Sequence, residues 1–221
     1  MRIISYCLVS VLLLTACVMS DTTSFVDPDY SDGGYQITKT VVKIDGATLK
    51  EVLSAETALV EKFSSLGVDA IKYTDLIPPT RDYSEKEAAK IIKDTGADSL
   101  FITMVGEKSE IESFVPPTYH AGTTTSYISG YGNFATVNTY TSPGYTTGGY
   151  TTSEPIMATK SLLIDLSNGN TVWQADGTSS GESFHSYVDL LISSGKSAIT
   201  DLHTKGLIQT VDLIETPDPK I

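Results

Sequence analysis

One serine lies in a pattern that is used for nucleophilic catalysis. Gly177-Thr178-Ser179-Ser180-Gly181 has the form Gly-x-Ser-x-Gly, and Asp201 and His203 follow it in the order nucleophile, acid, base. In hydrolases with this pattern, the serine attacks an acyl carbon from a sharp turn between a central strand and a helix. Here only 40 residues follow the pattern, and Asp201 and His203 lie two apart on one predicted helix, pointing to different sides. We therefore expect no catalytic nucleophile, but a polar turn that enters a helix with Ser180 or Ser183 near its N-cap.

Two further patterns could in principle bind a cofactor or a metal ion. Gly130-Tyr131-Gly132-Asn133-Phe134-Ala135 imitates a dinucleotide-binding glycine motif, but no strand-helix-strand unit surrounds it, and the residues after it favour strand or coil. The three histidines, His120, His185 and His203, are scattered over loop and helix without the spacing of metal ligands. The sequence predicts neither a cofactor nor a metal site.

A long uncharged segment is the stronger functional candidate. Between Glu112 and Glu154 there is no Asp, Glu, Lys or Arg over 41 residues, and Tyr, Thr, Gly and Ser dominate. Tyrosine presents a large amphipathic surface, and uncharged aromatic patches are typical of contact surfaces. We expect this insertion, residues 113–153, to contact a partner through its tyrosines. They are Tyr119, Tyr127, Tyr131, Tyr140, Tyr145 and Tyr150.

The same insertion is compatible with two other interpretations. Its high glycine content allows a flexible low-complexity loop that has no partner. Its lack of charged residues also allows two copies of the chain to pair through exposed strand edges, because charges on edge strands normally prevent such pairing. All three interpretations remain open at the level of sequence.

The N-terminus indicates export. Arg2 precedes an apolar run, Ile3 to Leu14, that is too short to span a bilayer, so residues 1–16 are predicted to be a secretory signal peptide. Leu14-Thr15-Ala16-Cys17 resembles the lipobox of bacterial lipoproteins. This resemblance implies cleavage between Ala16 and Cys17, with diacylglyceryl and acyl (palmitate) chains on Cys17. The alternative is an ordinary signal peptide in which Cys17 is incidental.

The position after the cysteine suggests where the chain is sorted. Val18, rather than Asp, follows Cys17, which in lipoproteins sorted as in enteric bacteria implies the outer membrane. Two or three acyl chains are sufficient to hold a soluble domain at a membrane, since each buried methylene contributes about 0.8 kcal/mol. We expect an outer-membrane, lipid-anchored protein that faces the periplasm.

Composition limits the possible partners. The net charge is −12, and it becomes −13 when Arg2 is removed with the signal peptide. This acidity argues against binding to nucleic acid or directly to anionic lipid. Cys7 lies in the signal peptide and Cys17 is the predicted lipid site, so the folded region has no disulfide or cysteine-ligated metal.

Periodicity predicts an α/β (α+β) fold with a mixed sheet, helices packed on it and three-layer character. The expected order is strand, helix, strand, helix, strand, insertion, two strands and a final helix, in a single domain over residues 36–208. Residues 17–35 are expected to be a lipidated N-terminus and flexible tether, and residues 209–221 a polar tail. The expected elements are strands at 37–44, 68–73, 99–105, 156–165 and 171–175, and helices after Gly46, after Ser84 and from Phe184 to Leu202.

Several side chains are expected to position these elements. Ser84-Glu85-Lys86-Glu87 is a capping box for the second helix, and Asn168-Gly169 indicates a hairpin turn. Trp173 is expected on the core side, and Gly195 where the last helix approaches the sheet closely. The first helix is expected to bury a stripe at Leu49, Val52, Leu53, Val60, Phe63 and Leu66.

Two segments give the chain a family resemblance. Residues 95–102, read as Thr-Gly-Ala-Asp-Ser-Leu-Phe-Ile, and the hairpin from Leu162 to Trp173 are similar to a group of envelope lipoproteins. The group includes the amino-terminal domain of the Tol-system propeller protein, the curli secretion-channel lipoprotein and the penicillin-binding-protein activator lipoproteins. The resemblance covers about residues 37–208 apart from the insertion. It implies a shared fold, with no enzyme active site.

Together these features predict a non-enzymatic contact or scaffolding lipoprotein of the bacterial envelope, with an envelope protein or a second copy as its partner. One alternative is binding of glycan or peptidoglycan, because aromatic faces stack on sugars. Another is an oligomeric subunit of a secretion channel, as the curli resemblance implies. Against the channel, strands that face lipid alternate apolar and polar residues over about ten positions, and residues 135–140 do so only briefly.

Overall fold

The computed structural model describes residues 18–31, 33–131 and 134–209, which form two compact units. Unit 1 runs up to Ser109 and resumes at Pro155, and unit 2 is the segment Glu110–Glu154. Unit 2 contains the predicted insertion. The predicted signal peptide lies outside the described residues, as does the predicted tail apart from Gln209.

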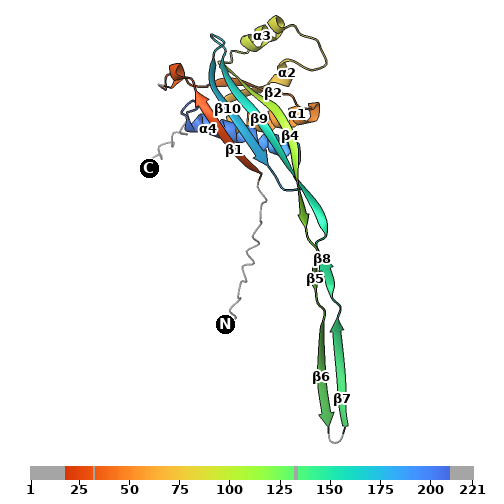
Figure 1. Ribbon diagram of the computed structural model, residues 1–221. Helices are drawn as coiled ribbons and strands as arrows, with labels where there is room; N and C mark the ends of the chain where they lie inside the picture. The colour runs from red at the N-terminus through yellow and green to blue at the C-terminus, as the bar shows by residue number, and fades with distance from the viewer. Residues whose placement is uncertain (1–17, 32, 132–133, 210–221) are drawn as a thin grey trace, which may run out of the picture. The chain divides into compact units, whose positions relative to one another are not determined.

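Unit 1 is built around a six-stranded mixed sheet with the strand order β1-β10-β9-β4-β2-β3 (Figure 1). β2 pairs in parallel with β3 and β4, whereas β10 pairs antiparallel with β1 and β9. This mixed sheet with its helices confirms the predicted α+β fold class. The strands are β1 (Met19–Val26), β2 (Lys39–Asp45), β3 (Asp69–Lys72), β4 (Ser99–Val115), β9 (Tyr150–Asp165) and β10 (Thr171–Ser180), of which β4 and β9 continue into unit 2.

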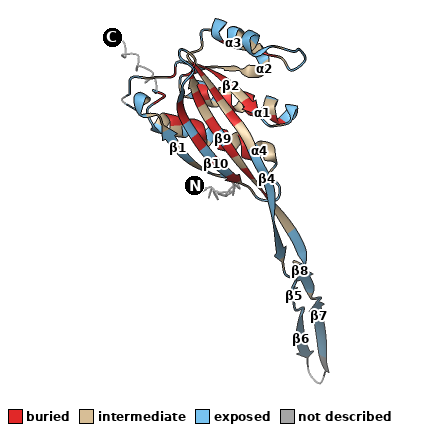
Figure 2. Cartoon of the chain, turned by 45° about the horizontal axis from the view of Figure 1, so that its top comes forward, coloured by how far each residue is buried: buried red, intermediate tan, exposed pale blue. Residues whose placement is uncertain are grey.

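Helices pack against both faces of this sheet. They are α1 (Leu49–Ser65), α2 (Tyr73–Leu76), α3 (Glu85–Asp94) and α4 (Tyr187–Thr204), with a short 3-10 helix at Pro28–Tyr30. Val42 of β2 lies in the larger core with α1 and α4, and its neighbour Val41 packs on the other face with residues of α2 and α3. Trp173 lies in the larger core, as predicted. Figure 2 shows the buried residues concentrated in these strands and helices.

Each of the three longer helices begins with a capping box. Ser84 and Glu87 cap α3 as predicted. α4 is capped by Ser186 and Asp189, so the expectation of Ser180 or Ser183 as N-cap is wrong. The predicted start of this helix at Phe184 is also wrong, because the helix begins at Tyr187, after Ser186 and Asp189 have formed the capping box.

The buried face of α1 differs from the predicted stripe. Ala55, Leu59 and Phe63 are fully buried, whereas Leu49 and Leu53 are exposed. Val52, between them, packs against the larger core, so Leu49 and Leu53 lie on the side of the helix that faces away from it. Phe63 is the member of the predicted stripe that is fully buried.

The predicted flexible tether is wrong over most of its length. Residues 19–26 form β1, which pairs antiparallel with β10 from Met19 opposite Ser180 to Val26 opposite Trp173. Hydroxyl groups fasten this edge strand: Ser20 Oγ lies 2.8 Å from Ser193 Oγ on α4, and Thr22 Oγ1 lies 2.9 Å from Ser197 Oγ. The strand was missed because its inward side chains are mainly small and polar.

Gly195 lies where α4 crosses α1, rather than against the sheet as predicted. A Cβ atom at this position would lie 2.7 Å from both Cδ atoms of Leu59. Leu59 itself is fully buried and cannot move away freely. The glycine therefore permits a close approach between the two helices that cover one face of the sheet.

We expect Gly195→Val to lower the free energy of unfolding by about 1–3 kcal/mol, because its side chain overpacks the contact with Leu59. Urea denaturation followed by circular dichroism measures this loss. The matched test is the double variant Gly195→Val with Leu59→Ala, which should lose less than the sum of the two single changes, since the smaller residue makes room. If the two losses of unfolding free energy simply added, the effect of Gly195→Val would not come from its contact with Leu59.

Candidate contact surface

Unit 2 is a two-stranded antiparallel ribbon, called here the ribbon (residues 110–154). Beyond the ends of β4 and β9, it consists of β5 (Thr118–His120) paired with β8 (Tyr145–Thr147), and β6 (Thr123–Tyr131) paired with β7 (Phe134–Ser142). The insertion is thus a regular hairpin rather than a loop without secondary structure. No side chain whose exposure is described in the ribbon is buried.

The β6–β7 register sorts the side chains onto two faces. Directly opposed residues share a face, and successive residues alternate. Tyr127 opposes Asn138 and Tyr140 opposes Thr125, so both tyrosines lie on one face, where their rings meet edge to face at 6.1 Å. This is the aromatic face of the ribbon.

The opposite face carries hydroxyl and aliphatic side chains. The hydroxyl oxygens of Ser126 and Thr139 lie 3.1 Å apart, and Ile128 opposes Val137. Both aliphatic side chains are more than half exposed. One face of this hairpin therefore offers aromatic rings, and the other offers hydroxyl groups with one aliphatic pair.

The β5–β8 segment is also packed locally. His120 stacks on Tyr145 with ring centroids 4.7 Å apart, and its Nε2 lies 2.9 Å from Thr147 Oγ1. Gly144 lies close to the neighbouring strand, where a Cβ atom would be 2.8 Å from the backbone carbonyl oxygen of His120. Glycine is required here for close packing, although its abundance suggested flexibility.

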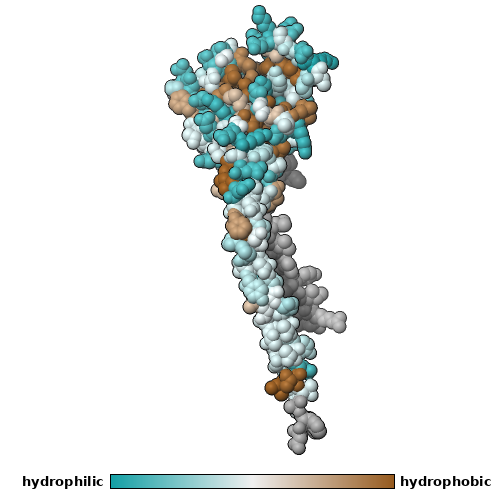
Figure 3. Space-filling view, turned by 45° about the vertical axis from the view of Figure 1, so that its right-hand side comes forward, coloured by the Kyte–Doolittle hydropathy of each residue, from teal (hydrophilic) through white to brown (hydrophobic). Residues whose placement is uncertain are grey.

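The predicted contact tyrosines are exposed wherever the structure describes their side chains. The exposed fractions are 69% for Tyr119, 62% for Tyr127, 68% for Tyr140, 62% for Tyr145 and 56% for Tyr150. Tyr131 ends β6 opposite Phe134, and its side chain lies outside the description. Figure 3 shows the ribbon in pale colours of intermediate hydropathy, whereas strongly hydrophilic side chains are frequent on unit 1.

The outer edges of the ribbon strands carry backbone N–H and C=O groups that, among the described residues, pair with no neighbouring strand. Within the described part of the chain, β6 pairs only with β7 and β5 only with β8, so each of these strands has one unpaired edge. An isolated two-stranded hairpin is marginally stable in water, and it gains stability from a further strand or a packed face. The exposed aromatic face and the free edges are therefore suited to contact with another surface.

The structure places the Gly-x-Ser-x-Gly segment in unit 1. It lies in β10 and its following residue, so the expected polar turn is wrong. Ser179 is buried, with its Oγ 2.7 Å from Ser20 Oγ. Asp201, at the acid position of the pattern, accepts a hydrogen bond of 2.9 Å from Nε1 of the buried Trp173.

The glycine motif and the three histidines, the other residues considered for cofactor or metal binding, lie on different elements. Gly130 and Tyr131 end β6, and Phe134 and Ala135 begin β7, so strands flank the glycine motif; Gly132 and Asn133 lie outside the described residues. His120 is in the ribbon, whereas His185 and His203 are in unit 1. Within residues 18–31, 33–131 and 134–209, no group of three or more His, Cys, Asp or Glu side chains could hold a metal ion.

The predicted anchor itself, Ala16 and Cys17, lies outside the described residues. The description begins at Val18, and β1 begins at Met19. None of the helices in the described part of the chain has the length and apolar character to cross a membrane.

The solved structures that resemble this chain include the following three, all with TM-scores below 0.5. A PelC dodecamer from Paraburkholderia phytofirmans is 18% identical, with a TM-score of 0.44, over 86% of this chain and 99% of that chain. A PelC point variant from the same organism is 17% identical, with a TM-score of 0.47, over 83% and 98%. The lipoprotein GNA1162 from Neisseria meningitidis is 13% identical, with a TM-score of 0.38, over 76% and 99%. No protein-family model and no curated protein sequence matches the chain significantly.

Proposed function

We propose that this chain is a bacterial outer-membrane lipoprotein that acts without catalysis, as a contact module for another protein of the envelope. The observation that carries the proposal lies within the ribbon: its residues 113–153, 41 in a row without Asp, Glu, Lys or Arg, include strands with exposed tyrosines and unpaired edges. Its partner is a protein surface that accepts an added strand and packs against the aromatic face.

Electrostatics support a protein partner. The chain carries a net charge of −12, and none of that charge lies between Glu112 and Glu154. A partner that contacts residues 113–153 of the ribbon therefore desolvates no Asp, Glu, Lys or Arg side chain of this segment. Native edge strands usually carry charges that prevent unwanted pairing, so a long uncharged edge favours pairing as its role.

The predicted lipid on Cys17 explains how the contact module is held at the membrane. Only Val18 separates Cys17 from β1, and two residue steps span at most about 7 Å. A lipid on Cys17 therefore holds the edge strand of the sheet close to the bilayer surface, rather than on a long tether. We propose the periplasmic face of the outer membrane as the site of action.

The test uses paired substitutions on the two faces of the ribbon. We expect Tyr127→Ser with Tyr140→Ser to reduce recovery of the crosslinked envelope partner, identified by mass spectrometry, by about tenfold or more, as loss of central aromatic contacts does at interfaces. The matched control, Ser126→Ala with Thr139→Ala, alters the opposite face and should change recovery far less. Equal effects of the two pairs would contradict docking through the aromatic face.

Two further readouts separate the rival functions. Retention on purified peptidoglycan sacculi that depends on Tyr127 and Tyr140 would assign the aromatic face to glycan binding instead. A detergent-solubilised species that contains several copies of this chain and no other protein would assign the ribbon to self-association. A single copy crosslinked to a different envelope protein is the result that we expect.

A further inference from the structure

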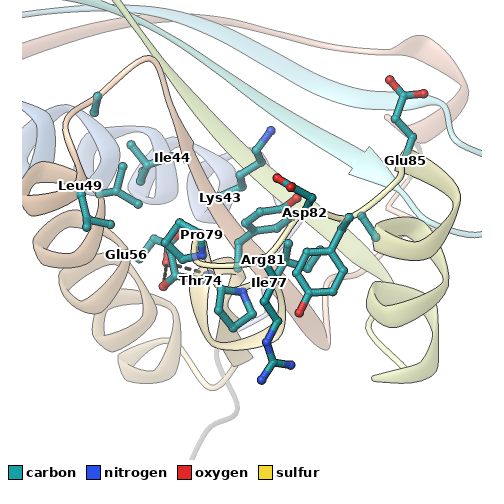
Figure 4. Close-up of a pocket in the computed structure, with 16 residues that line it drawn as sticks. Lys43, Ile44, Leu49, Glu56, Thr74, Ile77, Pro79, Arg81, Asp82 and Glu85 are labelled. Carbon is teal, nitrogen blue, oxygen red and sulfur yellow. Dashed lines mark hydrogen bonds between the residues drawn. The ribbon is translucent and has the colours of Figure 1, made fainter.

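Unit 1 contains a pocket of about 610 Å³ between β2, α1 and the segment that carries α2 and α3 (Figure 4). This volume falls in the range of small-molecule sites in proteins. Most of the lining is apolar or aromatic, and part of it, including Tyr73, Ile77 and Tyr83, also belongs to the second, smaller core. The main apolar contributors are Leu49, Val52, Tyr73, Ile77, Pro79 and Tyr83.

One acidic side chain in the pocket wall is fully buried. Glu56 of α1 has an exposed fraction of 0%. Its Oε2 accepts hydrogen bonds from the Thr74 backbone N–H at 3.2 Å and from Thr74 Oγ1 at 2.6 Å, as the dashed lines of Figure 4 show. Glu56 thereby fastens the first turn of α2 to α1.

This structural role uses only one of the two carboxyl oxygens. Among the described residues, Oε1 of Glu56 has no hydrogen-bond partner. A buried acceptor without a partner is costly, so such an atom beside a cavity is evidence for a missing donor. Burial raises the pKa of Glu56, and the negative charge of Asp75 adds to this effect, whereas the hydrogen bonds from Thr74 oppose it.

The cationic residues of the pocket do not supply that donor. The Lys43 ammonium lies 3.5 Å from Asp45 and over the ring of Tyr73, 5.4 Å from its centroid. Arg81 extends its guanidinium group away from Glu56 in Figure 4. The acidic lining residues Glu56, Asp82 and Glu85 outnumber these two basic ones.

We infer that this pocket binds a small organic cation, a primary ammonium on an apolar or aromatic body, with an ammonium N–H donated to Glu56 Oε1. The body packs against the apolar lining, including Ile77 and Pro79. The positive charge complements the acidic excess of the lining, and the ring of Tyr73 already holds one ammonium group at the pocket wall. This site goes beyond the proposed function and does not depend on the ribbon.

The test compares two probes with the same body on the full-length mature protein in detergent. We expect 2-phenylethylammonium to bind about tenfold more tightly than 2-phenylethanol in isothermal titration, because a charge-assisted hydrogen bond exceeds a neutral one. Glu56→Gln should abolish this preference, since the amide can still accept a bond from Thr74 but carries no charge. The matched control is Glu85→Gln on the pocket rim, which should preserve most of the preference.

A second variant keeps the test decisive if Glu56→Gln does not fold. Ala88→Leu places a larger side chain in the lining and leaves Glu56 in place, so it should weaken both probes. Equal affinity for the two probes, a preference that survives Glu56→Gln in a folded protein, or no binding of the ammonium probe would overturn the inference.

Discussion

Trp173→Ala is expected to lower the free energy of unfolding by about 3–5 kcal/mol. Trp173 is 1% exposed, and its ring lies on that of Phe101, with centroids 6.4 Å apart. Phe101 in turn meets Phe63 of α1 edge to face at 5.3 Å. Removing the indole leaves a cavity between strand and helix and removes the donor to Asp201. Urea denaturation followed by circular dichroism measures the loss.

Two controls separate the contributions of Trp173. Trp173→Phe retains most of the buried ring and should lose less than the alanine variant, with the difference reporting the bond to Asp201 and the remaining volume. Phe25→Ala removes an exposed aromatic side chain of β1 and should have a much smaller effect. A loss below about 1 kcal/mol for Trp173→Ala would contradict its central place in the core.

Cys17→Ser is expected to move nearly all of the protein from the membrane fraction to the soluble fraction. The serine hydroxyl cannot receive the diacylglyceryl group that the predicted lipobox directs to the thiol, and no acyl chains then enter the bilayer. Centrifugal fractionation of cells measures the distribution, and incorporation of labelled palmitate measures the modification.

The matched control for the anchor is the other cysteine of the chain. Cys7 lies in the apolar run of the predicted signal peptide, so Cys7→Ser should leave both fractionation and palmitate incorporation unchanged. If Cys17→Ser remained in the membrane fraction with the same label, the lipobox interpretation would be wrong and another anchor would be needed.

Apolar periodicity predicted the elements whose buried faces are hydrophobic. β2 and the first part of β4 follow the expected ranges closely, β9 ends and β10 begins where expected, and Ser84 caps α3 through a capping box. The hairpin turn at Asn168-Gly169 is present, with Gly169 at φ +79°. These features depend on residues close together in the chain, so they can be recognised from the sequence alone.

The main errors of the sequence prediction occur where small polar side chains pack between the sheet and α4. β1 and the second half of β10 face α4 with small polar side chains, so neither shows an apolar stripe. At Gly177 a Cβ atom would lie 2.7 Å from Thr159 Oγ1 and 2.8 Å from Ser194 Oγ, which leaves no room for a larger residue. Close packing of hydroxyl groups, which depends on residues far apart in the chain, made these segments resemble loops.

The candidate contact surface could be located from composition but not divided into faces. The lack of charge and the tyrosines identified residues 113–153 as a contact candidate. Which tyrosines share a face depends on the pairing register, because a shift of one residue would place Tyr127 and Tyr140 on opposite faces. The pocket beside Glu56 was not predicted, since β2, α1 and the α2–α3 segment meet there only in the folded chain.

In-cell photocrosslinking tests the central claim most directly. Photoreactive residues are placed singly at Tyr127 and Tyr140 on the aromatic face and at Lys90, an exposed residue of α3, as the control. The account predicts that both ribbon positions yield the same discrete crosslinked envelope protein and that Lys90 does not. Absence of a crosslinked protein at the ribbon positions, or the same product at Lys90, would contradict the proposal that the ribbon is the contact surface.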